Sequence, residues 1–265
     1  MSIDKAHKGA IKHAMHKEIV SDMHWTDADL AALAVEDGFR MRGLETTRLD
    51  TLIDAAFAFV LSILVISQSG IPETYEQLIT GIKSIPALAM SFWVLMLFWL
   101  AHREWSRRFG IESRQSIYIS VSLVFALLIY VYPLRLLFES MFHGLSNGFF
   151  PQSFAIQTEA QLRGFFVFYS CGYLVMAALL AALQNSALRR CDSLGLSKYE
   201  YWDTKAALFY WLLSGAVAIV ALVLAITIPI SYIGLAGYIY FSIFILLMVR
   251  VKLSKNARKT MLLPK

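Results

Sequence analysis

The chain has 265 residues, of which 58% are hydrophobic and 16% are charged, and its formal net charge is +5. A soluble domain carries about 25% charged residues, so this composition argues against an ordinary soluble protein. Two cysteines are too few for a disulfide framework.

Residues 1–45 form a polar N-terminal region without the apolar core of a cleavable signal peptide. Thr26-Asp27-Ala28-Asp29 is typical of a capped helix start. Two histidines in this region could share a helix face and hold a metal, but no cysteine or carboxylate completes an evident coordination set. We therefore expect a solvated segment without a metal or another cofactor. The histidines of this region are His7, His13, His16 and His24.

Six apolar segments follow, each long enough for a transmembrane helix, which needs about 20 residues. Pro133 is expected near the end of the third segment, Pro229 ends the fifth, and residues 139–163 form a long loop. The predicted fold class is all-α, a polytopic membrane protein with six transmembrane helices. The segments are residues 49–67, 82–101, 117–138, 164–183, 206–228 and 232–249.

Lysine and arginine residues give the orientation of these spans. Of 24 such residues, 21 lie before the first span or after the second, fourth and sixth, which predicts that both termini are cytoplasmic. This topology explains the basic charge without a nucleic-acid partner. We expect a cytoplasmic region over 1–45, a transmembrane domain over 46–253 and a basic cytoplasmic tail over 254–265 that faces anionic lipids. The expected location is the cell membrane, which is the cytoplasmic membrane in a prokaryote.

The first span has two distinct faces. At 100° per residue, one face carries an ascending row of side chains, and the carboxylates of Asp50 and Asp54 point roughly to the opposite side. These carboxylates either cap the helix at the headgroup level, or Asp54 anchors the helix to a neighbour. An apolar row with one hydroxyl is typical of helix packing, and pore lining is the alternative. The row consists of Arg48, Ala55, Phe59, Ser62 and Ile66.

Three motifs resemble the transmembrane-protein-175 family, which contains the endolysosomal potassium channel and its prokaryotic homologues. Arg48-x-x-x-Leu52-Ile53-Asp54 is similar to the family's Arg-x-x-x-Phe-Ser-Asp at the start of the first helix. Phe98-Trp99-Leu100-Ala101-His102-Arg103 resembles the Trp-x-x-His ending of the second helix, and Tyr132-Pro133-Leu134 resembles the end of the third. The resemblance covers about residues 48–135.

The resemblance implies a homotetramer in which four copies of the first span line a pore for K⁺ or other monovalent cations. Phe59 would form the constriction, Ser62 a hydroxyl layer and Ile66 a second apolar ring, so the pore would gate by dewetting. The family's Phe-Ser is Leu52-Ile53 here, and Phe59 is larger than the usual Ile or Leu.

The resemblance also implies a set of anchoring residues. Arg48 and Asp54 would hold the first span against the inner ends of the second and third spans, with Trp99 and His102 as partners. A second interpretation places His102 in the belt of residues at the membrane interface. Arg135 is expected to snorkel to the outer interface.

A secondary transporter or a non-conducting scaffold of the same fold is the alternative function, favoured by Leu52-Ile53 and Phe59. A transporter would show broken helices or charges at mid-membrane, but the first span has no Gly or Pro between Leu49 and Ser67. No P-loop, zinc-protease motif or nucleophile elbow occurs. We therefore expect no catalytic residue and no enzyme.

Overall fold

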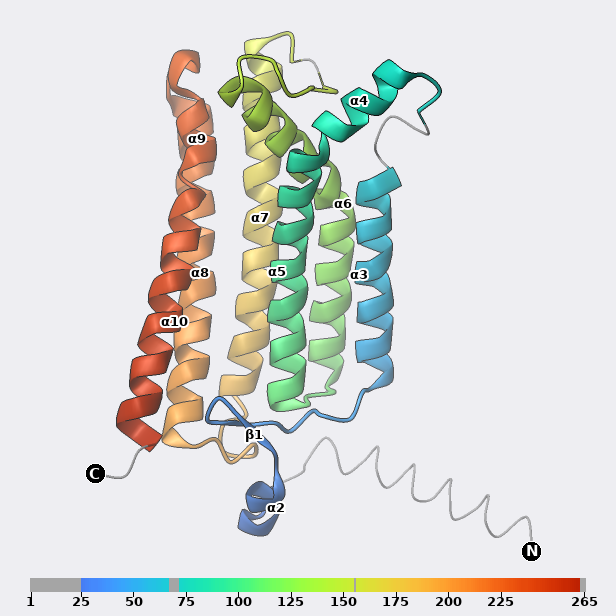
Figure 1. The fold of residues 1–265 in the computed structure, drawn as a ribbon. Helices are drawn as coiled ribbons and strands as arrows, with labels where there is room; N and C mark the ends of the chain where they lie inside the picture. Colours follow the sequence, from blue (N-terminus) through green and yellow to red (C-terminus); the bar gives the residue numbers. More distant parts are fainter. Residues whose placement is uncertain (1–24, 67–71, 155, 263–265) are drawn as a thin grey trace, which may run out of the picture.

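Long helices make up most of the computed structural model, which describes residues 25–66, 72–154 and 156–262, and they run side by side (Figure 1). Within these residues, six helical segments are long and apolar enough to cross a membrane. The sixth is built from η1, α9 and α10 in succession. The elements are α2 (Asp27–Ala32), β1 (Val35–Glu36), β2 (Phe39–Arg40), α3 (Arg48–Ile66), α4 (Tyr75–Lys83), α5 (Ile85–Phe109), α6 (Arg114–Leu145), α7 (Glu159–Leu188), α8 (Lys198–Thr227), η1 (Ile230–Tyr232), α9 (Gly234–Tyr238) and α10 (Phe241–Leu262).

The six predicted spans are confirmed, but several helices extend well beyond the apolar segments. α5 continues past Ala101 and ends where Gly110 adopts a left-handed conformation with φ of 59°. α6 continues to Leu145, so Pro133 lies inside the helix, and the predicted position of Pro133 near the helix end is wrong. Hydropathy marks only the apolar part of a helix, whereas backbone hydrogen bonding continues through polar residues until a cap ends it. A proline is tolerated in a membrane helix because neighbouring groups satisfy the freed carbonyl.

The connection between the first two predicted spans contains a further helix, α4. α4 begins after Thr74, whose side-chain oxygen accepts a hydrogen bond of 3.2 Å from the backbone nitrogen of Gln77. This N-cap satisfies one of the free N–H groups of the first turn. The helix crosses the end of the bundle above α5 and α3 (Figure 1).

α7 is the central helix of the bundle, and it packs mainly against α6 and α8. Half of its apolar window is buried, compared with 22% for α3 and 11% for the last span. The main neighbours of α3 are α5 and α6, and the main neighbour of α10 is α8. α3 and α10 therefore form opposite edges of the unit (Figure 1).

A short hairpin closes the end of the bundle near which α2 and the end of α10 lie (Figure 1). β1 pairs antiparallel with β2 through a turn at Asp37 and Gly38, whose φ angles are 52° and 83°. Two positive φ angles match the twist of a tight hairpin. Phe39 is completely buried with its ring 5.5 Å from that of Phe109.

The helix start predicted at Thr26 is confirmed, since Thr26 forms a capping box with Asp29 at the start of α2. The hydrogen bonds from Thr26 lower the pKa of the Asp29 carboxyl. The histidines considered for a metal site, His7, His13, His16 and His24, lie outside the described residues.

The close approach of α6 and α7 at Gly172 gives a test of this packing. A Cβ at Gly172 would lie 2.7 Å from Cδ2 of Tyr130, whereas a Cβ at Gly164 on the same helix would meet nothing within 4 Å. We expect Gly172→Val to lower the unfolding free energy by about 1–3 kcal/mol through overpacking. Thermal unfolding in detergent measures the loss, with Gly164→Val as the matched control. Equal losses in both variants would contradict the packing described.

Candidate functional site

α3 is packed on one side only. Its buried residues occur at intervals of four, three and four, which places them along one face of a helix. Each of these side chains is at most 3% exposed, and they pack against α5 and α6. The sequence of α3 therefore forms a helix with one apolar contact face. The buried residues are Ile53, Phe57, Val60 and Leu64.

The opposite face of α3 holds the row of residues predicted to line a pore. Phe59 is 60% exposed and Ile66 is 76% exposed, although both are large and apolar. Arg48, Ala55 and Ser62 are exposed along the same line. At 100° per residue this row lies about 180° from the buried face. The row thus faces away from its own subunit along the length of the helix.

The hydroxyl of Ser62 sits in the middle of this free face. Its Oγ donates a hydrogen bond of 2.9 Å to the carbonyl oxygen of Ala58, one turn earlier. Because the hydroxyl proton is used within the helix, the oxygen lone pairs face outward as acceptors. Such an arrangement suits a cation better than an anion.

Two carboxylates fix the N-terminal end of α3 to α5. Nε1 of Trp99 donates a 2.8 Å hydrogen bond to Oδ1 of Asp54, as the resemblance implied. Oγ of Ser106 donates to Oδ1 of Asp50, whose Oδ2 also accepts from the side chain of Thr47. Asp50 thus caps α3 and binds α5 at once. Hydrogen bonds to charged groups each contribute about 1.5–3 kcal/mol.

His102 has a different partner from the one predicted. Its Nε2 lies 2.9 Å from Oγ of Ser120 on α6, and the side chain is only 3% exposed. Both interpretations of His102, as a belt residue and as a partner of Asp54, are therefore wrong. His102 follows Trp99 by three residues, which leaves its side chain about 60° short of a full turn at 100° per residue. His102 therefore faces α6, while Trp99 faces α3. It joins α5 to α6.

Arg48, the first residue of α3, is exposed. No ion pair of Arg48 occurs in the part of the chain that the structure describes. Its predicted contact with the second and third spans is thus absent from this subunit's described contacts.

A polar cavity of about 250 Å³ opens beside the N-terminal end of α3. It lies between the start of α3, the polar end of α5 and the loop before α3. Its wall contains two carboxylates, two guanidinium groups and the buried imidazole described above. The cavity keeps the charged anchors of α3 in contact with water, which reduces the cost of placing them at a membrane edge. The charged and titratable residues that line it are Asp50, Asp54, His102, Arg103 and Arg107.

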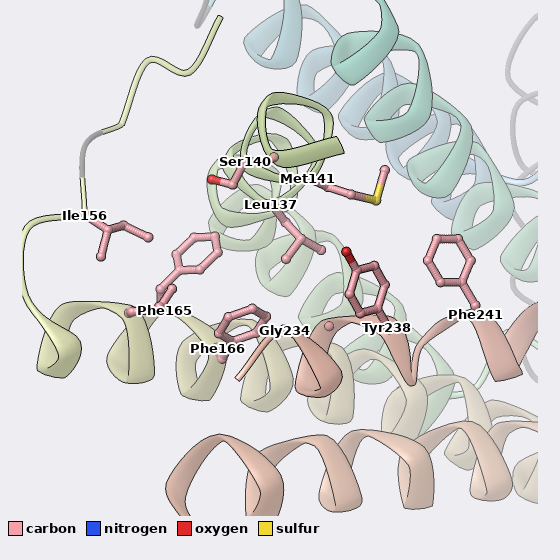
Figure 2. A pocket seen from close by; sticks show the side chains of 12 residues that line it. Leu137, Ser140, Met141, Ile156, Phe165, Phe166, Gly234, Tyr238 and Phe241 are labelled. Atoms are coloured by element: carbon pink, nitrogen blue, oxygen red, sulfur yellow. The ribbon is translucent and has the colours of Figure 1, made fainter. Parts of the chain in front are cut away.

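A second cavity, of about 200 Å³, lies on the far side of the subunit between α6, α7 and α9 (Figure 2). Figure 2 shows the rings of Phe165, Phe166, Tyr238 and Phe241 around it, with Ser140 at its margin. Among the described residues that line it, none is charged and none comes from α3. This apolar cavity is therefore unsuited to an ion path.

Arg135 does not snorkel to the outer interface, so that prediction is wrong. Its side chain is 8% exposed, and Nε lies 2.8 Å from Oε1 of Glu139 one turn later. The backbone nitrogen of Ser153 also donates to Glu139, so this pair holds the loop after α6. The longer α6 places Arg135 inside the helix bundle. The spacing of four residues between Arg135 and Glu139 is the sequence signal for the pair.

Comparisons with known proteins agree with this architecture. The family model described as "Endosomal/lysosomal potassium channel TMEM175" matches residues 48–133. A protein of Marivirga tractuosa named "Potassium channel" is 28% identical over 217 residues, which is 79% of this chain and 87% of the relative. The crystal structure of a variant of the potassium channel MtTMEM175, solved with a nanobody–MBP fusion protein, superposes with a TM-score of 0.72 at 25% identity. It covers 84% of this chain and 100% of the matched chain.

The fold and the six apolar helices define a multi-pass helical membrane protein. The TMEM175 family model, the curated relative and the solved structure are all similar to this chain, and all three are described as potassium channels. The resemblance seen in the sequence is thereby confirmed, and the matched residues 48–133 span α3, α5 and most of α6.

The anchor between α3 and α5 can be tested with a double-mutant cycle. Asp54→Ala and Trp99→Phe each remove one partner of the 2.8 Å hydrogen bond. We expect each change to destabilise the protein by about 1.5–3 kcal/mol, and the double variant to lose little more than either single one. Thermal unfolding in detergent measures the three losses.

Trp93→Phe, on the exposed side of the same helix, serves as the control for removal of an indole N–H. Strictly additive losses for Asp54→Ala and Trp99→Phe would show that the hydrogen bond contributes nothing.

Proposed function

We propose that this chain is a potassium channel and not an enzyme, with four copies of α3 around a central pore. The observation that carries the proposal is the free face of α3, where Phe59 and Ile66 are exposed although both are large and apolar. The names of its relatives, which are potassium channels, support the choice of ion.

Assembly follows from the geometry of one subunit. A single helix at the edge of a unit cannot enclose a path across the membrane, and a cyclic assembly of identical subunits can. A homotetramer with α3 at its axis would turn the row from Arg48 to Ile66 inward. The contact face of α3 would remain on α5 and α6, as it is in the subunit.

The proposed pore has two apolar rings and one hydroxyl ring. Phe59 forms the constriction, and Ile66 forms a second ring about two turns away. Apolar constrictions gate by dewetting, and small oxygen ligands can replace part of an ion's hydration shell. The outward acceptors of Ser62 would supply those ligands between the two rings.

α3 runs as an unbroken helix from Arg48 to Ile66. Transporter binding sites form where half-helices end near mid-membrane. The continuity of α3 therefore favours the channel over the secondary transporter.

We further propose that both termini are cytoplasmic. The segment from α2 to β2 and the end of α10 lie at the same end of the bundle, which an even number of spans requires (Figure 1). The channel domain would cover residues 46–253, with residues 1–45 and 254–265 on the cytoplasmic side, although α10 itself continues to Leu262. The bacterial relative supports the cytoplasmic membrane as the location.

The pore hypothesis predicts that a smaller side chain at the constriction increases conduction. In Phe59→Ala, removal of four phenyl rings would widen the apolar constriction and favour a wetted pore, so we expect several-fold faster potassium flux. Flux from proteoliposomes with purified protein measures the change. Phe209→Ala on α8 is the matched control, because Phe209 is 61% exposed and Phe59 is 60% exposed.

Unchanged or abolished flux in Phe59→Ala, with normal tetramer assembly, would count against Phe59 as the constriction. Absence of flux from the unmodified protein and both variants, with the tetramer confirmed, would support a non-conducting scaffold.

We also propose that the inner end of α10 binds anionic lipid headgroups. Lys252, Lys255 and Lys259 are exposed and share one face of this helix. Each lysine near an anionic surface contributes about 1 kcal/mol. Replacing all three with glutamine should remove most of the stabilisation that phosphatidylglycerol gives over phosphatidylcholine in thermal unfolding. An undiminished lipid effect, or one that persists at about 1 M salt, would contradict the proposal.

A further inference from the structure

Residues 35–43, which we name the strap, pass beneath the bundle and lead into α3 through residues 44–47 (Figure 1). The strap comprises the hairpin of β1 and β2 and the three residues after it. It precedes residue 48, where the family match begins. The pore helix is thus joined, through residues 44–47, to a segment that lies outside the family-model match.

A buried carboxylate of α8 holds the strap. Glu200 is completely buried, and its Oε1 accepts a 2.7 Å hydrogen bond from the backbone nitrogen of Arg40. Its Oε2 lies 2.8 Å from Nη2 of Arg40 and 3.1 Å from Nη2 of Arg42. Two guanidinium groups and the backbone N–H groups of Arg40 and Ser197 on a single carboxylate supply the pairing that a buried charge requires.

The strap is also held by α5 and α10. The guanidinium of Arg108 lies over the buried ring of Phe39, with Cζ 4.5 Å from the ring centroid. The backbone nitrogen of Gly43 donates a 3.0 Å hydrogen bond to the carbonyl oxygen of Arg107. At the tip of the hairpin, Asp37 forms an ion pair with Arg258 of α10.

The tip of the hairpin is packed too tightly for a side chain at Gly38. A Cβ there would lie 3.3 Å from Cε1 of Tyr199 on α8 and would overlap Leu262 of α10. The φ angle of 83° at Gly38 adds backbone strain to any other residue. The strap therefore docks in one defined position against α8 and α10.

These contacts lie on the side of the subunit away from the free face of α3. We infer that the strap positions the pore helix, by holding the inner end of α3 toward α8 and α10 and away from the channel axis. This inference rests on the proposed function, since it takes the free face of α3 to mark the axis. Release of the strap would let the inner ends of α3 approach one another and narrow the pore.

Charge reversal at the tip of the hairpin tests the inference. Asp37→Arg places two like charges together, and so does Arg258→Asp, whereas the double swap restores the ion pair. We expect each single variant to conduct potassium several-fold more slowly than the unmodified protein in proteoliposomes, and the double swap to recover the flux. Gly38→Val should slow the flux as well, while Gly81→Val, where a Cβ would meet nothing within 4 Å, should leave it unchanged.

A distance measurement separates this inference from the proposed function. Spin labels on cysteines at Thr46 and Lys205, both exposed, report the separation of the start of α3 from α8 within one subunit. Cys171 and Cys191 are replaced by serine, and labelled subunits are diluted with unlabelled ones. We expect the distance to lengthen in Gly38→Val and in both single charge reversals. In the double swap we expect it to return to the value of the unmodified protein.

An unchanged distance in these variants would overturn the inference whether or not the protein conducts. A longer distance with unchanged flux, in a protein that conducts, would also overturn it. Failure of the unmodified protein to conduct would count against the proposed channel alone, and the distance would still decide whether the strap positions α3.

Discussion

One-sided attachment of α3 is the constraint on which the rest of the candidate site depends. Asp54 and Asp50 bind the side chains of α5 at the inner end, and the apolar residues from Ile53 to Leu64 continue the same contact face along the helix. Since both polar and apolar contacts are made by one face, the other face has no partner among the described residues of the subunit. The exposure of Phe59, Ser62 and Ile66 follows from this geometry and not from any property of those residues alone.

Polar interactions gather at the two ends of the bundle, and the carboxylates in them are buried. At the inner end, Glu200 binds the strap and Asp203 forms an ion pair of 2.7 Å with Arg108, so α8 is joined to both the strap and α5. At the other end, Arg135 and Glu139 hold the loop after α6. Charged groups removed from water require paired and hydrogen-bonded partners, and each of these carboxylates has them. The apolar middle of the helices is left to close packing around α7.

The separation of polar contacts at the ends from apolar packing in the middle is compatible with a channel. The helices that surround α7 form a fixed frame, while α3 meets that frame through a single face and through two carboxylates near a polar cavity. A helix attached in this way can move toward its free side without disrupting the packing of the subunit core. The strap adds a second attachment from below, which reaches α8 and α10 on the far side of the frame.

The sequence by itself determined the six spans, the two faces of the first one, the pairing of Asp54 with Trp99 and the resemblance to the TMEM175 family. Each of these depends on periodicity, hydropathy or a local motif, which neighbouring residues carry in full. Only the tertiary structure decided that His102 meets Ser120, that Arg135 is buried with Glu139, and that Glu200 holds Arg40 from 160 residues away. The observed helix ends also differ from the predicted span ends, because caps and not hydropathy terminate helices. Side-chain partners on different helices depend on rotation and crossing of those helices, which no local pattern specifies.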